Sequence, residues 1–265
     1  MSRVLITGCS TGFGRAAAVE LTKRGHEVVA TARRPETLDD LDVASRLALD
    51  VDDPTSVRAA VDAAGPVDAL VNNAGFGVAG PVETVSLDAA RRCMETNLFG
   101  AARMIQAVLP GLRAGGGGTI VNVSSAAGRV GAPLDGFYSA TKWALEGLSE
   151  SLHFEVSHFG IRVRIVEPGA FETAFDGNAV RGGIEGTPYE ELDRQWEAAR
   201  PALIGDGPPP TAELVASVIA DAIESTAPRL RWLVGPDAEL AIGAKDSMPF
   251  EDFESSMRDL LGVTW

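Results

Sequence analysis

The chain has 265 residues, of which 45% are hydrophobic and 23% charged, an ordinary composition for a globular protein. Lys and Arg number 23 against 37 Asp and Glu, so the net charge is −14, which argues against nucleic acid and anionic membranes as partners. The longest uncharged stretch, 114–128, is too short for a membrane span, and an apolar run directly after Arg3 leaves no room for a signal peptide. Two cysteines, and three histidines without metal-ligand spacing, indicate neither a disulfide framework nor a structural metal, so we expect a cytoplasmic protein.

Short β-type runs recur from the first residues of the chain onward. Several of these runs are almost wholly apolar, which is typical of strands that are covered on both faces in a parallel sheet. We expect strands at 3–7, 27–31, 46–49, 68–71, 119–123, 161–166 and 231–234.

Helical patterns fill the intervals between these runs. The alternation of strand and helix predicts the α/β class, with a doubly wound parallel sheet of about seven strands in a single domain over residues 1–265. The expected helices run from Gly12 to about Arg24, from near Pro54, twice within about 87–113, over about 137–159, and after the triple proline 208–210 with Thr211 as a candidate N-cap.

Residues 170–210 form the least regular region, which holds several glycines and prolines together with Phe171, Phe175, Tyr189 and Trp196. Because this region follows the sixth strand, at the edge of the sheet where α/β proteins bind ligands, we expect it to form a lid over the substrate. The alternative is a surface insertion with a short helix over 189–200.

A glycine-rich turn, Thr7-Gly8-Cys9-Ser10-Thr11-Gly12-Phe13-Gly14, closes the first strand and opens the first helix. Glycines let the backbone turn sharply, and the free N–H groups of a helix N-terminus suit a pyrophosphate, which favours dinucleotide binding over a turn that binds nothing. The same residues match G-x-S-x-G, which would make Ser10 the nucleophile of a serine hydrolase. Such an elbow lies deep in a sheet, however, whereas this turn follows the first strand, and His153 and His158 fall within a helix.

Further motifs follow in order: Asn72-Asn73-Ala74-Gly75, Asn97, Ser125, Tyr138-x-x-x-Lys142 and Pro168-Gly169. Together with the glycine-rich turn, this ordered set resembles the short-chain dehydrogenase/reductase family over at least residues 3–175. Stretches such as Lys142-Trp143-Ala144-Leu145-Glu146-Gly147-Leu148 resemble its 17β-hydroxysteroid dehydrogenase-like branch. The resemblance implies a Rossmann-type fold and an oxidoreductase that uses a nicotinamide dinucleotide.

Tyr138 and Lys142 carry the chemistry that such a reaction needs. Hydride transfer to a ketone leaves an alkoxide, which a tyrosine can protonate, but a free phenol has a pKa of about 10. Since the two residues are four apart, they lie on one face of a helix, where the ammonium of Lys142 would stabilise the phenolate of Tyr138 and lower its pKa. Tyr138 would then act as acid in reduction and as base in oxidation.

The resemblance also implies roles for other positions. Ser125 would hydrogen-bond the substrate oxygen. Adjacent strand residues point to opposite faces, so only one of Ser124 and Ser125 can face the site, and we expect it to be Ser125. Asn97 would hold a water behind Lys142 for proton relay, unless it is a polar residue satisfied within its helix. Cofactor contacts are expected from Gly8, Ser10, Gly12, Phe13, Gly14, Asp50, Val51, Asn73, Ala74, Gly75, Tyr138, Lys142, Pro168, Gly169 and Thr173. For Asp50 the alternative is a turn former.

The residues after the second expected strand bear on the choice of cofactor. They read Thr31-Ala32-Arg33-Arg34, with no acid before Glu36. A carboxylate here would bind the ribose 2′-hydroxyl of NAD, whereas an arginine pairs with the 2′-phosphate of NADP. We therefore expect NADP(H), with Arg33 on the phosphate unless it is an exposed loop arginine. Arg34 and Arg15 are secondary candidates.

Apolar residues around the expected site, among them Phe76, Val78, Val130, Leu134 and Phe171, predict a hydrophobic cavity for a small apolar ketone or aldehyde and its alcohol. The branch resemblance suggests steroid-like or retinoid-like substrates, and the family resemblance implies a homodimer or homotetramer. The alternative from another class is a non-catalytic, dinucleotide-binding redox sensor. The intact catalytic motifs favour the enzyme, because a sensor needs only the glycine-rich turn.

Overall fold

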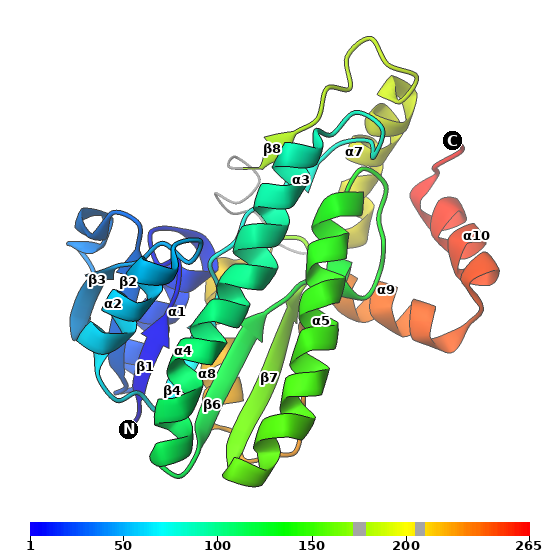
Figure 1. The fold of residues 1–265 in the computed structure, drawn as a ribbon. Helices are drawn as coiled ribbons and strands as arrows, with labels where there is room; N and C mark the ends of the chain where they lie inside the picture. The colour runs from blue at the N-terminus through cyan, green and yellow to red at the C-terminus, as the bar shows by residue number, and fades with distance from the viewer. Residues whose placement is uncertain (172–178, 205–209) are drawn as a thin grey trace.

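The central sheet has seven parallel strands in the order β3-β2-β1-β4-β6-β7-β9 (Figure 1). The computed structural model describes residues 1–171, 179–204 and 210–265. The seven expected strands are confirmed with ends that differ by at most two residues: β1 (Arg3–Ile6), β2 (Glu27–Ala32), β3 (Ser45–Ala48), β4 (Ala69–Asn72), β6 (Gly118–Val123), β7 (Ile161–Pro168) and β9 (Arg231–Val234). Strands β2 and β3 lie on one side of β1, and β4 and the later strands lie on the other, so the strand order reverses between β1 and β4. Ligands of doubly wound sheets bind at this point, outside the carboxyl ends of the strands.

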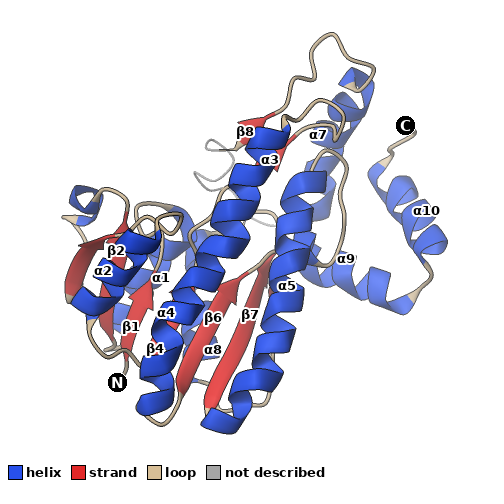
Figure 2. Ribbon diagram, viewed as in Figure 1, coloured by secondary structure: helices blue, strands red, loops and turns tan. Residues whose placement is uncertain are grey.

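Two layers of helices cover the sheet (Figure 2). One face carries α2 (Pro54–Ala64), α4 (Ala101–Ala114) and α5 (Gly136–Val156), and the other carries α1 (Gly12–Lys23) and α8 (Ala212–Glu224). Each layer has its own apolar core, so the middle strands are buried on both faces, which explains their nearly continuous apolar sequences. The fold is a Rossmann-like α/β domain, as the sequence predicts.

Several elements are absent from the sequence-based expectation. The expected helices within 87–113 are α3 (Leu87–Met94) and α4, and a π-helical turn, η2 (Glu95–Gly100), joins them. Two-residue strands β5 (Val78–Ala79) and β8 (Val180–Arg181) pair in parallel above the main sheet. The other unexpected elements are 3-10 turns η1 (Pro35–Leu38), η3 (Ala126–Gly128) and η4 (Ser157–Phe159), and helices α9 (Pro236–Ser247) and α10 (Phe250–Leu261). Helix α7 (Glu190–Ile204) lies where the alternative interpretation of 170–210 places a short helix over 189–200. Thr211 does precede α8, but its side chain makes no capping hydrogen bond.

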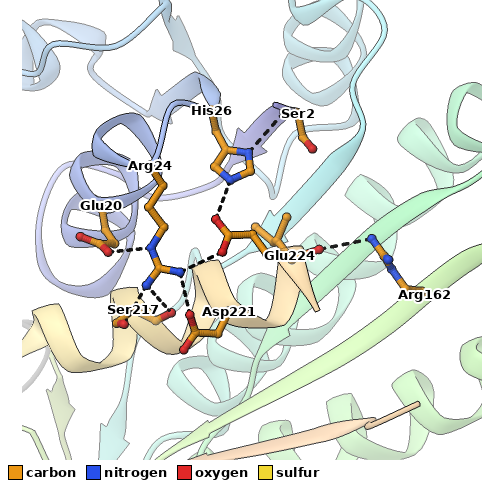
Figure 3. A network of polar contacts seen from close by, with 9 residues as sticks. Ser2, Glu20, Arg24, His26, Arg162, Ser217, Asp221 and Glu224 are labelled. Atoms are coloured by element: carbon orange, nitrogen blue, oxygen red, sulfur yellow. Dashed lines mark hydrogen bonds and ion pairs between the residues drawn. The ribbon is translucent and has the colours of Figure 1, made fainter. Parts of the chain in front are cut away.

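Arg24, directly after α1, ties that helix to α8 (Figure 3). Its guanidinium donates to the carboxylates of Asp221 at 2.6 Å and Glu224 at 3.1 Å. It also donates to Ser217 Oγ at 2.9 Å, and His26 Nε2 lies 3.0 Å from Glu224. Because α1 begins in the glycine-rich turn, these contacts help to hold the helix whose N-terminus faces the carboxyl edge of the sheet.

Over the described residues, no helix has both the length and the apolar character that crossing a membrane requires. Within the same residues, no group of three or more His, Cys, Asp or Glu side chains is arranged to hold a metal ion.

Candidate active site

The glycine-rich turn is braced from the end of β4. The backbone N–H groups of Asn73 and Ala74 both donate to Thr7 Oγ1 at 2.9 Å, and Asn73 Nδ2 donates to the carbonyl oxygen of Gly8 at 3.1 Å. Gly8 has φ of +74°, a left-handed conformation that favours glycine. A Cβ atom at Gly14 would collide with that same carbonyl oxygen. Gly8 and Gly12 therefore present bare backbone to the cavity at the N-terminus of α1, which suits an anion.

A single cavity of about 1150 Å³ begins at this turn and continues along the carboxyl ends of the strands. Of the predicted site residues, its wall includes Gly8, Ser10, Gly12, Phe13, Arg33, Asp50, Val51, Asn73, Ala74, Gly75, Ser125, Tyr138, Lys142, Pro168 and Gly169. Gly14 is packed under the turn, Asn97 is buried outside the wall, and Thr173 lies outside the described residues. The structure thus brings nearly all of the predicted residues to one place.

Tyr138 and Lys142 face the cavity from one side of α5. Lys142 Nζ lies 5.8 Å from the centre of the Tyr138 ring and donates to the carbonyl oxygen of Val123, at the end of β6, at 2.9 Å. Lys142 is 6% exposed, and its burial lowers its pKa to about 8. An ammonium in such surroundings is poorly hydrated, so it acts strongly on a neighbouring phenol.

Ser125 caps the short turn η3 at the end of β6. Its Oγ accepts the backbone N–H of Ala127 at 3.1 Å and donates to the carbonyl oxygen of Pro168 at 3.4 Å. Ser124, its neighbour, is 3% exposed, and its Oγ lies beneath Gly128. The choice of Ser125 as the substrate-facing hydroxyl therefore has geometric support, and its role stays a prediction.

Asn97 lies in the π-helical turn η2, and such turns often occur at functional sites. Its amide holds the backbone of Phe76, accepting that N–H and donating to that carbonyl oxygen at 3.0 Å each. It also donates to Thr141 Oγ1 at 3.1 Å, next to Lys142. In the structure Asn97 joins the strand-end loop to α5, and a relay role stays a prediction.

Arg33 and Asp50 line the cavity at the carboxyl ends of β2 and β3. Arg33 is exposed and follows β2, and no hydrogen bond or ion pair engages its guanidinium within the described part of the chain. Asp50 also acts as the turn former that the alternative interpretation describes, since its Oδ1 accepts the N–H of Asp52 at 3.1 Å. Arg15 forms an ion pair with Asp40, which makes it a weaker candidate for a phosphate than Arg33.

Asp237 is a site residue that sequence reasoning missed. It lies in the first turn of α9, 7% exposed, and its Oδ2 accepts the backbone N–H of Ala170 at 2.5 Å. A side chain at Gly169 would collide with this carboxylate, and burial raises the pKa of Asp237. The Gly235-Pro236-Asp237 sequence after the last strand is the signal that could have revealed it, because Pro at the first turn marks a helix start.

The C-terminal segment also forms part of the wall, which the sequence analysis missed. In Figure 1, α9 leads away from the sheet to α10, and α10 and the chain end lie on the side of α7. Phe253 and Met257 on α10 and Trp265 line the cavity. The chain end is fixed to α7 because Thr264 N–H donates to Gln195 Oε1 at 2.8 Å. The apolar spacing within 250–261 could have indicated this amphipathic helix.

The arrangement around Ser10 does not support a hydrolase. Ser10 lies on the cavity wall, but neither His153 nor His158 is among the lining residues. A serine nucleophile needs a base within hydrogen-bond reach. Tyr138 and Lys142 line the same cavity.

Comparison with known proteins agrees with this geometry. The family model "short chain dehydrogenase" matches residues 2–182. The chain is 38% identical over 249 residues to human retinol dehydrogenase 8, covering 86% of this chain and 79% of that protein. It is 39% identical over 207 residues to human 17-beta-hydroxysteroid dehydrogenase type 1, covering 72% of this chain and 62% of that protein.

A bacterial relative and a solved structure are also similar. The chain is 43% identical over 179 residues to 3-ketodihydrosphingosine reductase of Bacteroides thetaiotaomicron, covering 66% of each protein. A crystal structure of a short-chain dehydrogenase from Streptomyces avermitilis superposes with a TM-score of 0.84 at 34% identity, covering 100% of this chain and 98% of that one. The chain therefore belongs to the short-chain dehydrogenase family of NAD(P)-dependent oxidoreductases.

Proposed function

We propose that the protein is an NADP(H)-dependent dehydrogenase/reductase that interconverts a ketone or aldehyde and an alcohol on a small hydrophobic molecule. One observation carries the proposal: Tyr138 and Lys142 lie together on the wall of a cavity that begins at the glycine-rich turn. A protein that only sensed a dinucleotide would have no use for a phenol and a buried ammonium beside the substrate space.

In this mechanism Tyr138 protonates the substrate oxygen during reduction and accepts the proton during oxidation. Lys142 stabilises the phenolate, because a cation close to the ring lowers the pKa of Tyr138. Ser125 donates a hydrogen bond to the same oxygen and so shares its developing negative charge. The buried amide of Asn97 keeps α5 in register with the loop after β4.

The residues present fit a dinucleotide. The side-chain-free surface of Gly8 and Gly12 would hold the pyrophosphate, Asp50 and Val51 the adenine, and Arg33 the 2′-phosphate. Pro168 and Gly169, and Thr173 by resemblance, would hold the carboxamide end. The nicotinamide supplies or accepts the hydride when it is bound. Asp237 accepts the backbone N–H of Ala170, so it fixes the backbone beside Gly169 on the cavity wall.

The lining supports an apolar substrate. The wall includes Val130, Leu134, Trp196 and Phe253 with other apolar residues of α7 and α10, and these two helices also contribute the charged residues Asp193, Glu197, Glu254 and Arg258. The names of the similar proteins point to retinol, a 17β-hydroxysteroid and 3-ketodihydrosphingosine, all largely apolar molecules with one reacting oxygen. The region 170–210 would act as the lid, since its described parts line the same space.

Replacing Tyr138 by phenylalanine tests the proposal. A panel of cyclic, aryl and long-chain ketones and aldehydes is screened by NADPH consumption, and binding is followed by NADPH fluorescence. The variant should bind NADPH as the wild type does and lose turnover by orders of magnitude. Tyr189→Phe is the matched control, because the hydroxyl of this second tyrosine donates to Glu83 at an exposed site. Unchanged turnover in Tyr138→Phe would overturn the mechanism and favour another role.

The cofactor preference has its own test. Arg33→Ala should weaken binding of NADPH by about tenfold or more and leave NADH nearly unchanged, because a charge-assisted pair with the 2′-phosphate is lost. Arg58→Ala, at an exposed position of α2 outside the cavity wall, is the matched control, and Arg34→Ala tests the secondary candidate. Equal affinities for NADPH and NADH in the wild type would contradict the assignment.

A homodimer or homotetramer also remains part of the proposal, with the cytoplasm as its expected location. Phe99, Trp143 and Phe154 on η2 and α5 are between 48% and 82% exposed, which is typical of a surface that pairs with another copy. Light scattering after size exclusion should give two or four chain masses, and Phe154→Glu should lower the mass. A monomer in the wild type would contradict this part.

A further inference from the structure

A buried cluster of acidic and basic side chains lies one helical turn along α5 from Lys142. Glu146 on α5 is 5% exposed, and Glu167 on β7 is 0% exposed. Arg231 on β9 lies between them, with Nε 3.1 Å from Glu146 Oε2 and 3.2 Å from Glu167 Oε1. The proposed reaction uses neither carboxyl group, although both lie close to the residues that it does use.

The positive charge available to these two carboxyl groups is divided. Arg129 lies 3.6 Å from Glu167, but it also lies 2.8 Å from the exposed carboxylate of Asp246. Arg231 likewise donates to the exposed carboxylate of Glu150 at 2.7 Å. Two inner and two outer carboxyl groups thus share two guanidinium groups.

The inner pair therefore favours holding a proton. Burial, and after it the negative charge of Glu146, together raise the pKa of Glu167 to about 7. Within the described residues, Glu146 Oε1 and both carboxyl oxygens of Glu167 are buried without a hydrogen-bond partner. A proton shared between the two carboxyl groups removes the repulsion and supplies a hydrogen bond, so near neutral pH the pair carries one negative charge.

This charge acts on Lys142 from the next turn of α5. Glu146 follows Lys142 by four residues, so the two side chains lie on one face of α5. Gly128 lets the backbone of η3 lie close against the turn that bears Glu146, since a Cβ there would come within 3.1 Å of Glu146 Cγ. Both side chains are buried, with Glu146 5% and Lys142 6% exposed.

The groups around Lys142 can be ranked by their charge. Its burial lowers its pKa, and Cys93 and Glu146 act against that lowering. Burial raises the pKa of the Cys93 thiol to about 11, so this thiol is uncharged at neutral pH. Glu146 is then the group that bears a negative charge when Lys142 is protonated.

The charged and titratable groups around this cluster are Tyr138 and Glu150 on α5, Cys93 on α3, Arg129 after η3, Glu167 on β7, Arg231 on β9, and Lys245 and Asp246 on α9.

We propose that Glu146 is a positioning residue that keeps the side chain of Lys142 charged beside Tyr138, while Glu167 holds the proton that the two carboxyl groups share. This inference rests on the proposed function, in which the ammonium of Lys142 stabilises the phenolate of Tyr138. It adds Glu146, one helical turn after Lys142 on α5, to the residues that support proton transfer.

The chain offers a direct measurement, because it has only three lysines: Lys23, Lys142 and Lys245. Carbon NMR of protein labelled at the lysine ε-carbon follows the charge of each one against pH and requires neither substrate nor turnover. In the wild type, the Lys142 resonance should titrate near pH 8 and show a second, smaller step near pH 7, where the carboxyl pair loses its proton. Lys142→Met assigns the resonance.

Glu146→Gln should lower the Lys142 pKa by about one unit, because the nearest negative charge is removed. The double variant Glu146→Gln with Glu167→Gln should lower it at least as much, since no charge can then move to Glu167. Glu150→Gln is the matched control: it is exposed and shares Arg231, and it should shift the resonance far less. If Glu146→Gln fails to fold, the step near pH 7 in the wild type decides, and its absence would overturn the proposal.

A pH profile of alcohol oxidation links the charge to the reaction. With the best alcohol from the panel, the acidic limb of kcat/KM should move upward by about one unit in Glu146→Gln and stay in place in Glu150→Gln. An unmoved Lys142 pKa, or an unmoved limb beside a moved Lys142 pKa, would refute the positioning role. Unchanged turnover in Tyr138→Phe would instead refute the proposed function, while the NMR result still stands.

Discussion

Replacing Lys142 by methionine should stabilise the folded protein at neutral pH while abolishing turnover. Burial lowers the Lys142 pKa from 10.5 to about 8, so the unfolded chain binds this proton more tightly than the folded one does. The difference corresponds to about 3 kcal/mol that the charge takes from stability below pH 8. Methionine fills a similar space without charge, but the hydrogen bond to the Val123 carbonyl oxygen is lost, which costs about 1 kcal/mol. The expected net gain at pH 7 is about 2 kcal/mol.

The sign of this effect fixes its pH window. Between pH 8 and 10.5 the folded Lys142 has lost its proton and the unfolded lysine has kept it, so the stability of the wild type rises with pH relative to the variant. Urea denaturation at pH 7, 8.5 and 10 should therefore show that the difference in free energy of unfolding between Lys142→Met and the wild type shrinks as the pH rises. Lys23→Met, at an exposed position of α1, is the control and should change stability by less than about 0.5 kcal/mol. A variant less stable than the wild type at pH 7, or a gap that is equal at pH 7 and pH 10, would refute the reasoning.

Three further expectations concern the turn, the contacts between α1 and α8, and the C-terminal wall. Gly14→Ala should lower the free energy of unfolding by about 1–3 kcal/mol and weaken NADPH binding. Gly147→Ala, with open space around its Cβ on α5, should raise the free energy of unfolding by about 0.5–1 kcal/mol. Urea denaturation that ranked the two variants equally would contradict this. Arg24→Ala removes the ion pairs to α8 and should lower Tm by about 2–4 °C, and high salt should shrink that difference. Phe253→Ala should raise KM for the bulkiest active ketone more than KM for a small one, and equal changes would show that α10 does not contact the substrate.

The sequence predicts the sheet and most of the cavity wall because both depend on local patterns. A strand buried on both faces must be apolar, and the glycine-rich turn and the Tyr138–Lys142 spacing each lie within a few residues of chain. The pairing of β5 with β8, by contrast, joins residues about a hundred positions apart and leaves no pattern in strands of two residues. The partner of Arg15 is equally invisible, since Asp40 reaches it only after η1 folds back toward α1.

Asp237 and α10 were missed for a different reason. Asp237 matters because its carboxylate holds the backbone after β7, and that contact exists only once β9 is placed beside β7. For α10 the amphipathic pattern was present, but a pattern does not say which surface a helix covers. Trp265 lies on the cavity wall because Gln195 on α7 holds the chain end there.

Helix α5 shows how these two kinds of information combine. Tyr138, Lys142, Glu146 and Glu150 follow one another at intervals of four, so the helix alone places them in one row about 6 Å apart. Their chemistry differs because β6, β7 and η3 bury the middle of that row and leave Glu150 half exposed. Burial makes the charge of Lys142 costly, and the same burial makes it effective on Tyr138, since a fully hydrated ammonium would hardly change the acidity of a phenol. A stabilising change at Lys142 and the loss of turnover therefore have one physical cause.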